Sequence, residues 1–213
     1  MPEPPVRGRP PLSRERIVRA ALRLIDERGL AACTMRALGA ELGVEAMSLY
    51  RHVRGKEDLW DGVVDLLQEG LAGEVPDPAD WRAVMRGFAL RFRAVAREHP
   101  HAFPLLARRP ATGYLAARGL AERGLRTLVD AGFTPEEAAA ALRAVSRWVI
   151  GFALTEAAAA GGARPASDDA AEPAGEGHPL LAGLLGALAA EPPDELFLFG
   201  LDLLLDGLAA RLA

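Results

Sequence analysis

The sequence predicts an all-α protein with a small three-helix N-terminal domain and a larger helical C-terminal domain. Half of its 213 residues are hydrophobic, Ala and Leu prevail, and only 6% are aromatic. This composition favours helices over sheets. Apolar residues also recur at helical spacing along most of the chain. The periodic segments are short and separated by glycines up to residue 60 but long after residue 80, which indicates two domains.

The first two predicted helices have clear signals at both ends. Ser13 is a favourable N-cap for a helix that Gly29 ends, and Thr34 is a favourable N-cap for a second helix that Gly43 ends. The second helix has barely two turns and needs partners to be stable. The apolar face of the first helix supplies them through Ile17, Ala20, Ala21, Leu24 and Ile25.

A third short helix is expected over 45–52, followed by a connecting helix over 56–72. Two short helices joined by a glycine turn need a third helix to close a core, which the first helix provides. We therefore expect a helix-turn-helix domain over 13–60, preceded by a flexible basic arm over 1–12. The residues expected to face its core are Leu38, Leu42, Val44, Leu49 and Val53.

The second domain is expected over 73–213. Proline, glycine and aspartate between residues 73 and 80 indicate a connection. The stretch 161–177 lacks apolar periodicity and is expected to be a mobile loop. The long helices are expected over 81–98, 112–131, 135–160 and 193–212.

Cysteine content and hydropathy indicate a cytoplasmic protein. Cys33 is the sole cysteine, which excludes an intramolecular disulfide and a cysteine-based zinc site within one chain. The N-terminus has no apolar run after Arg9, so it lacks the pattern of a signal peptide. No segment reaches the ~18 uninterrupted apolar residues of a membrane helix.

Charge is distributed unevenly along the chain. The net charge is −4, with 25 basic and 29 acidic residues. Residues 1–60 hold 11 basic and 8 acidic residues, a local +3, which leaves 14 against 21, or −7, for 61–213. A basic N-terminal domain is compatible with phosphate binding, although a solvated helix surface would show the same small excess.

The predicted helix 45–52 has the side chains of a DNA recognition helix. Such a helix enters the major groove while flanking residues hold phosphates. Met47 suits a thymine methyl, and Tyr50 and Lys56 suit phosphate oxygens. The expected DNA contacts are Thr34, Arg36, Glu45, Ala46, Met47, Ser48, Tyr50, Arg51, His52 and Lys56. Spacing alone leaves open that Met47 and Tyr50 are core residues and that the charges form a solvated face.

The run from Thr34 to Leu59 resembles the DNA-binding domain of the TetR family. In that family a Leu-Tyr-x-His-x-x-x-Lys pattern spans the recognition helix and the start of the next helix. The matching residues here are Leu49, Tyr50, His52 and Lys56. The resemblance implies a regulator of transcription that binds double-stranded DNA. The leading Arg7-Gly-Arg-Pro10 resembles arms that enter an A·T-rich minor groove, the alternative being a disordered tail.

The C-terminal part resembles the tetracycline-repressor class of C-terminal domains. The segments that carry the resemblance are Arg108–Pro110, Asp130–Phe133, Val145–Gly151 and Phe197–Asp206. It implies a homodimer held by a four-helix bundle of helices 135–160 and 193–212. The last helix also has a wider apolar surface than one core stripe needs. The expected interface residues are Val145, Trp148, Phe197, Leu201, Leu204, Leu205 and Leu208. A two-fold dimer places two recognition helices about 34 Å apart, which suits a palindromic operator.

Members of this family usually bind a small molecule in the C-terminal domain. The aromatic and apolar residues expected to line such a pocket are Phe88, Phe92, Phe103, Leu106, Tyr114, Trp148 and Phe152. Leu105 and the region of Ala72 match positions of the histidines of tetracycline-binding members, and Thr155 stands where an acidic partner is expected. We therefore expect an effector that is apolar or weakly polar, rather than magnesium-tetracycline, and no cofactor or metal.

Two alternatives to a ligand-responsive repressor stay open. One is a DNA-binding regulator that responds to no ligand. The other is a helical enzyme that uses His99 and His101, but these flank a proline without metal-ligand spacing, nucleophile motif or phosphate loop. We assign no catalytic residue. Cys33 beside a helix start fits a redox thiol or a buried small residue.

Overall fold

The computed structural model describes residues 11–71, 80–108, 118–160, 179–180, 183–184 and 193–212. Within these ranges every regular element is a helix, as the composition predicts. Residues 1–10 of the expected arm 1–12, most of the connection 73–80 and the loop 161–177 lie outside them. The N-terminal part, residues 11–71, is called the head here, and the described residues from 80 onward are called the body.

The head contains four α-helices and one 3-10 turn. They are α1 (Arg14–Arg28), η1 (Leu30–Ala32), α2 (Met35–Leu42), α3 (Ala46–Leu49) and α4 (Lys56–Glu69). Ser13 caps α1 by accepting a hydrogen bond from the Arg16 amide, and Thr34 caps α2 by accepting one from the Ala37 amide. Gly29 and Gly43 end these helices at φ 80° and 68°, a region that favours glycine. The predicted helix ends are confirmed.

Helices α1 and α4 cross at close range because Gly62 has no side chain. A Cβ atom at Gly62 would lie 2.6 Å from a methyl carbon of Val18. The apolar face predicted for α1 is buried, together with Leu59 and Val63 of α4. The first helix therefore closes the head core, as expected from the shortness of α2 and α3.

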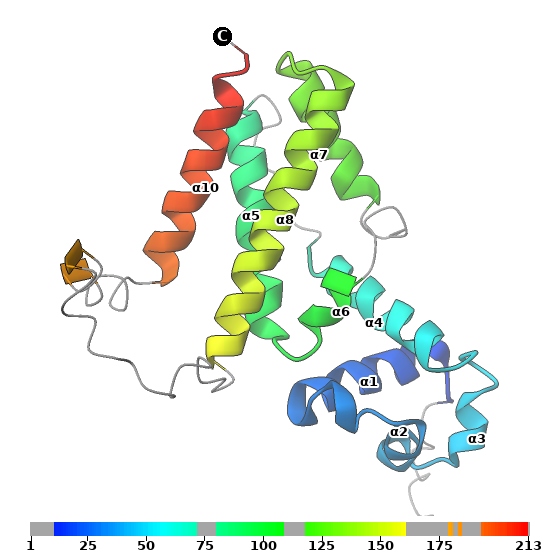
Figure 1. The fold of residues 1–213 in the computed structure, drawn as a ribbon. Coiled ribbons are helices and arrows are strands. Elements are labelled where there is room, and N and C mark those ends of the chain that lie inside the picture. Colours follow the sequence, from blue (N-terminus) through cyan, green and yellow to red (C-terminus); the bar gives the residue numbers. More distant parts are fainter. Residues whose placement is uncertain are drawn as a thin grey trace, which may run out of the picture.

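The body is built around one long helix. Its helices are α5 (Trp81–Glu98), α6 (Phe103–Arg108), α7 (Arg118–Asp130), α8 (Pro135–Ala160) and α10 (Pro193–Ala209). Helix α8 packs against α5, α7 and α10 (Figure 1). The boundaries of α5 and α8 are those expected. The final helix ends at Ala209, before the expected Leu212, because the chain continues as a turn.

Helix α8 is long and apolar enough to meet the length and composition test for a membrane span over Pro135–Ala158. Ala138, Val145 and Val149 form its buried side, and 28% of the window is buried within the chain. One such helix is weak evidence for a membrane span, since helices of soluble proteins pass the same test.

Helices α5 and α10 are joined by a ladder of ion pairs. Arg82 contacts Asp206 at 2.8 Å, and Arg86 pairs with Asp202. At the other end Arg93 and Arg97 both bind Glu156 of α8 and Asp194 at the start of α10. The acidic residues of α10 thus lie along a basic stripe of α5.

The head contacts the body through α4 and α1. Helix α4 packs against α6 (Figure 1). Asp26 near the end of α1 lies 2.8 Å from Nδ1 of His99, which follows α5. A shift of α6 would therefore change its contact with α4 and so act directly on the head.

Candidate nucleic-acid interface and ligand pocket

The turn between α2 and α3 is tight because of Gly39. The Val44 amide donates to the Gly39 carbonyl at 2.9 Å. A Cβ atom at Gly39 would lie 2.9 Å from the Val44 carbonyl oxygen and 3.1 Å from the Ala46 nitrogen. These are backbone atoms that a rotamer change cannot move. The angle between α2 and α3 therefore depends on a glycine at this position.

Replacing Gly39 by alanine is expected to destabilise the head by about 2 kcal/mol, because the added methyl group must displace the backbone of the turn. Chemical denaturation followed by circular dichroism measures the change. Ala40→Ser is the matched control, since it adds one heavy atom at the next, exposed position and is expected to stay within about 0.5 kcal/mol of the parent. Equal stabilities for the two variants would contradict the tight-turn assignment.

Helix α3 is shorter than the predicted 45–52. Its α-helical part is Ala46–Leu49, and Tyr50 to His52 continue as a turn in which the His52 amide donates to the Leu49 carbonyl. The expected inward residues Leu38, Leu42, Leu49 and Val53 are buried, whereas Val44 is half-buried. The buried residues fix which side of α3 faces solvent.

The outward side of α3 carries large side chains that the head does not cover. Met47 is 72% exposed and Tyr50 is 47% exposed. Neither is a core residue, so that part of the alternative is wrong, whereas a solvated charged face stays open. Of the other expected DNA contacts, Glu45 and Arg51 are exposed and Ala46, Ser48 and His52 are half-buried. Met47 and Tyr50 are therefore accessible to a partner molecule, while the buried Leu49 between them packs in the head core.

Thr34, Arg36 and Lys56 are exposed, the first two at the start of α2 and the third at the start of α4. The Thr34 hydroxyl oxygen accepts the capping hydrogen bond at 3.1 Å, which leaves its proton available to a phosphate. The Lys56 ammonium lies 5.3 Å from the Trp60 ring centroid at the start of α4. This contact holds the lysine stem while the charge stays accessible.

Asp58 is a structural member of this surface that the sequence reasoning missed. Its carboxylate accepts a hydrogen bond from the Arg54 amide at 2.9 Å and pairs with Arg14 of α1 at 2.7 Å. The Arg54 amide and then the Arg14 guanidinium lower the pKa of Asp58. Asp58 thereby ties the turn before Lys56 to α1. The sequence signal that could have identified Asp58 is an acidic residue in the first turn of a helix, where a negative charge is favourable.

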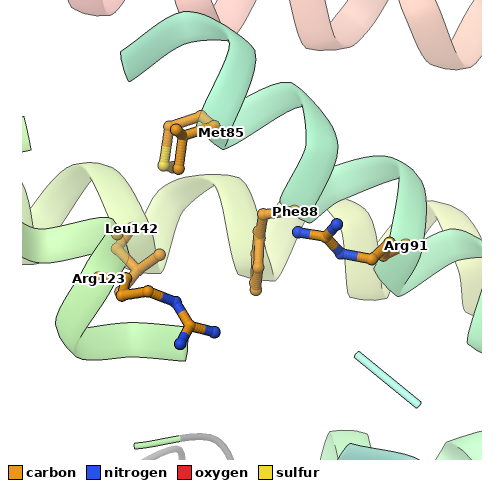
Figure 2. Close-up of a pocket in the computed structure, with 7 residues that line it drawn as sticks. Met85, Phe88, Arg91, Arg123 and Leu142 are labelled. Atoms are coloured by element: carbon orange, nitrogen blue, oxygen red, sulfur yellow. The ribbon is translucent and has the colours of Figure 1, made fainter. Parts of the chain in front are cut away.

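A pocket opens in the body between α5, α7 and α8 (Figure 2). Its cavity volume is about 10 Å³, room for about one water molecule, within a wider hollow of about 300 Å³ that includes open solvent. Its lining is Val84, Met85, Phe88, Arg91, Arg123, Gly124 and Leu142. The four α5 residues share one helical face, which periodicity could have found, but their partners on α7 and α8 had no sequence signal.

The pocket differs from the expected one. Of the expected residues, only Phe88 lines it. Phe92, Phe103 and Leu106 are buried core side chains, and the ring of Phe92 packs edge-on against Phe103. Trp148 and Phe152 pack instead on Phe197 of α10. Tyr114 lies outside the described residues. The expected effector-pocket residues therefore stay a prediction.

The expected dimer interface also needs correction. Val145, Phe197, Leu201 and Leu205 are at most 1% exposed within one chain, so they cannot meet a second copy. Trp148, Leu204 and Leu208 are half-buried. The exposed apolar side chains of α10 are instead Leu196, Leu198, Phe199 and Leu203. Because α10 is apolar on all sides, its sequence does not show which side the rest of the chain covers.

His99, His101 and Cys33, the residues of the enzyme and redox alternatives, have separate surroundings in the described part of the chain. His99 is held by Asp26, and His101 is exposed on the following turn. Burial raises the pKa of the Cys33 thiol to about 11, so the reactive thiolate is scarce at neutral pH. Among the described residues there is no cluster of three or more His, Cys, Asp or Glu that could hold a metal ion.

Two family models match the chain. Residues 17–63 match the model described as bacterial regulatory proteins, tetR family. Residues 75–212 match the model described as tetracyclin repressor-like, C-terminal domain. The first match ends within α4, and the second begins before α5.

Curated relatives agree with these matches. The tetracycline repressor protein class A from transposon 1721 of Escherichia coli is 33% identical over 92% of this chain and 89% of its own length. The repressor DrrR1 of Streptomyces coeruleorubidus is 35% identical over 71% of this chain, but the match spans only 57% of that protein.

Solved structures have the same fold. The Streptomyces coelicolor protein ActR in complex with actinorhodin matches with a TM-score of 0.78 and 27% identity, over 94% of this chain and 97% of the other. BioQ with its double-stranded DNA operator matches with a TM-score of 0.69 and 25% identity, over 94% and 99% of the two chains.

Proposed function

The chain belongs to the tetR family of bacterial regulatory proteins, and we propose that it is a cytoplasmic repressor of transcription that binds a palindromic operator as a homodimer and is released by a small molecule. Residues 13–60 bind DNA, the helix over 56–72 connects, and residues 73–213 dimerise and bind the effector. The resemblance of the chain to curated repressors supports a regulator rather than an enzyme.

The observation that carries DNA binding is the outward surface of α3. Leu49 is buried, whereas Met47 and Tyr50 are exposed. The stability of the head therefore does not explain why large side chains occupy these two exposed positions. The methyl group of Met47 suits contact with base edges in a major groove, and the hydroxyl group of Tyr50 suits contact with the phosphate backbone. The operator complex of BioQ, a structure of the same fold, supports the same use of the head.

Dimerisation is supported by two neighbouring exposed stripes. On α10 the stripe is Leu196, Phe199 and Leu203, of which Phe199 is 61% and Leu203 59% exposed. On α8 the exposed stripe consists mostly of small residues, namely Ala140, Ala144, Arg147, Gly151 and Thr155. The two helices meet where Trp148 packs on Gly200, at which a Cβ would lie 2.5 Å from the indole ring. Large apolar side chains beside small ones suit a four-helix bundle with a second copy.

Effector release is supported by the pocket in the body and by the contact of α6 with α4. The structure of ActR in complex with actinorhodin shows that a protein of the same fold binds a small molecule. A ligand releases DNA only if it binds the free form more tightly, and reversing a 99:1 population takes about 5.5 kcal/mol of differential affinity. A regulator that responds to no ligand is the alternative that a release screen decides.

Selection of bound duplexes from a random DNA library at ~150 mM salt tests the proposal, since non-specific phosphate attraction is weakened there. We expect enrichment of a palindrome with half-sites about one helical turn apart. A library that yields no enriched sequence would contradict sequence-specific repression.

Replacing single side chains of the head is expected to separate phosphate contacts from base contacts. Tyr50→Ala and Lys56→Ala should weaken binding to the selected operator and to unrelated DNA by similar factors. Ser48→Ala and Arg36→Ala should also change the preferred sequence, at about 1–3 kcal/mol per lost base contact. Fluorescence anisotropy on both DNAs measures the ratio. Equal losses on every DNA for all four variants would contradict this division of roles.

A further inference from the structure

We propose that the contact between Asp26 of α1 and His99 at the end of α5 fixes the position of the head on the body, and that in a dimer it thereby sets the spacing of the two recognition helices. Both are positioning residues, since neither belongs to α3 or to the expected DNA contacts. The inference rests on the proposed function only for its consequence, which is the half-site spacing that the protein prefers.

The described residues of the head give no reason for an acidic side chain at Asp26. It lies in the last turn of α1, where the helix dipole favours positive rather than negative charge. Its Oδ1 atom is buried and accepts no hydrogen bond from the described residues, which is costly for a carboxylate. Its Oδ2 atom lies 2.8 Å from Nδ1 of His99. The partner that explains Asp26 therefore belongs to the body.

The backbone of His99 is held at the junction of α5 and α6. Its amide donates to the Val95 carbonyl oxygen at 2.9 Å, and its own carbonyl oxygen accepts hydrogen bonds from the Ala102 and Phe103 amides at 3.1 and 2.8 Å. Ala102 and Phe103 are completely buried. The imidazole therefore extends from a rigid part of the body. Since a carboxylate only accepts hydrogen bonds, Nδ1 of His99 carries the proton that is donated to Asp26.

The place of Asp26 along α1 makes the contact effective. Helices α1 and α4 meet where Val18 faces Gly62, and α4 packs against α6. Asp26 lies eight residues beyond Val18, about 12 Å along the helix axis. The head thus touches the body at one point on α4 and another on α1, and the second point opposes rotation about the first. Helix α3 lies on the side of the head away from α6 (Figure 1), so such a rotation would displace α3.

The preference of the protein for one half-site spacing tests the proposal. Fluorescence anisotropy is measured on the selected palindrome and on the same half-sites moved apart by one and by two base pairs. The parent is expected to bind the selected spacing at least about tenfold more tightly, since only there do both linked heads engage. Asp26→Ala and His99→Leu should each reduce this preference to within about threefold, because loosely held heads adapt to either spacing. Discrimination between the operator and unrelated DNA should remain.

Glu27→Ala is the matched control, because it removes the same charge from the next, exposed position of α1. It should keep the spacing preference of the parent. An unchanged preference in Asp26→Ala and His99→Leu, an equal loss of preference in Glu27→Ala, or equal losses of affinity on every spacing would each overturn the proposal.

The position of the head is also measured without DNA. Spin labels on Glu41→Cys in α2 and Ala94→Cys in α5 occupy exposed sites of the head and the body. Cys33 stays unlabelled, because burial raises the pKa of its thiol to about 11. With labelled chains diluted into unlabelled protein, the parent should give a narrow distance distribution that Asp26→Ala broadens and Glu27→Ala does not. Equal widths in all three proteins would contradict the contact.

The two measurements separate this inference from the proposed function. A distribution that broadens in Asp26→Ala, in a protein that selects no operator, would uphold the positioning of the head and contradict the repressor. A selected operator whose spacing preference survives in Asp26→Ala and His99→Leu would uphold the repressor and contradict the positioning role.

Discussion

The Phe199→Glu/Leu203→Glu double variant is expected to be monomeric and to bind the selected operator at least about 100-fold more weakly than the parent. Both side chains are more than half exposed on α10, so neither contributes to the core of one chain. Two carboxylates from each copy would face each other across the bundle and cannot be buried there without a large cost. Operator affinity falls because two linked heads gain a factor of 10²–10⁴ over one.

Sedimentation equilibrium and operator titration measure the two effects on the same samples. Leu198→Glu is the matched control, because it introduces the same charge at a partly exposed leucine of α10 outside the Leu196, Phe199 and Leu203 stripe. That control should stay dimeric and retain operator affinity within about threefold. A double variant that remains dimeric would show that α10 does not form the interface.

The Glu156→Leu variant is expected to lose about 3 kcal/mol of unfolding free energy. Glu156 binds Arg93 through two hydrogen bonds of 2.8 and 2.9 Å, and the Arg93 side chain is only 6% exposed. Removing the carboxylate leaves a buried guanidinium with a weakened set of partners, which typically costs 3–5 kcal/mol. The lower end applies because Arg93 keeps Asp194 and the Pro193 carbonyl oxygen.

The Arg93→Met/Glu156→Leu double variant is the control that isolates the charge. Exchanging a buried ion pair for apolar residues of similar volume is often neutral or stabilising, so the double variant should be more stable than Glu156→Leu alone. The Phe152 and Phe197 rings, on which Arg93 rests at 5.1 and 4.4 Å from the centroids, would receive the methionine. A double variant no more stable than Glu156→Leu would contradict this account.

The stability difference between the parent and Glu156→Leu should depend on pH. Burial raises the pKa of Glu156, but the hydrogen bonds from Arg93 and Arg97 outweigh it, and the pKa lies below its usual value of 4.5. A lowered carboxylate pKa contributes stability that is present above the unfolded-state pKa and is lost as the pH falls through the folded-state pKa. The difference should therefore be constant between pH 6 and 8 and narrow below about pH 4. Denaturation at several pH values measures it.

Local signals predicted the head and most helix boundaries correctly. Ser13, Thr34 and Gly43 act on backbone groups within four residues, so the sequence around each of them determined where a helix begins or ends. The spacing of the apolar residues likewise predicted that Leu38 and Leu49 are buried and that Met47 and Tyr50 are exposed. The exceptions are α3, whose last residues form a turn, α4, which ends at Glu69 before the expected 72, and α10, which ends at Ala209 before the expected Leu212.

The sequence by itself determined an all-α chain, a helix-turn-helix head and an apolar final helix, because propensity, capping and periodicity are local properties. Only the tertiary structure decided which side of α10 its own chain covers and which residues meet in the pocket. These depend on segments such as α5, α7 and α8 that lie far apart in sequence and meet only when packed. Phe197 and Phe199, two residues apart on one helix, are 0% and 61% exposed for that reason.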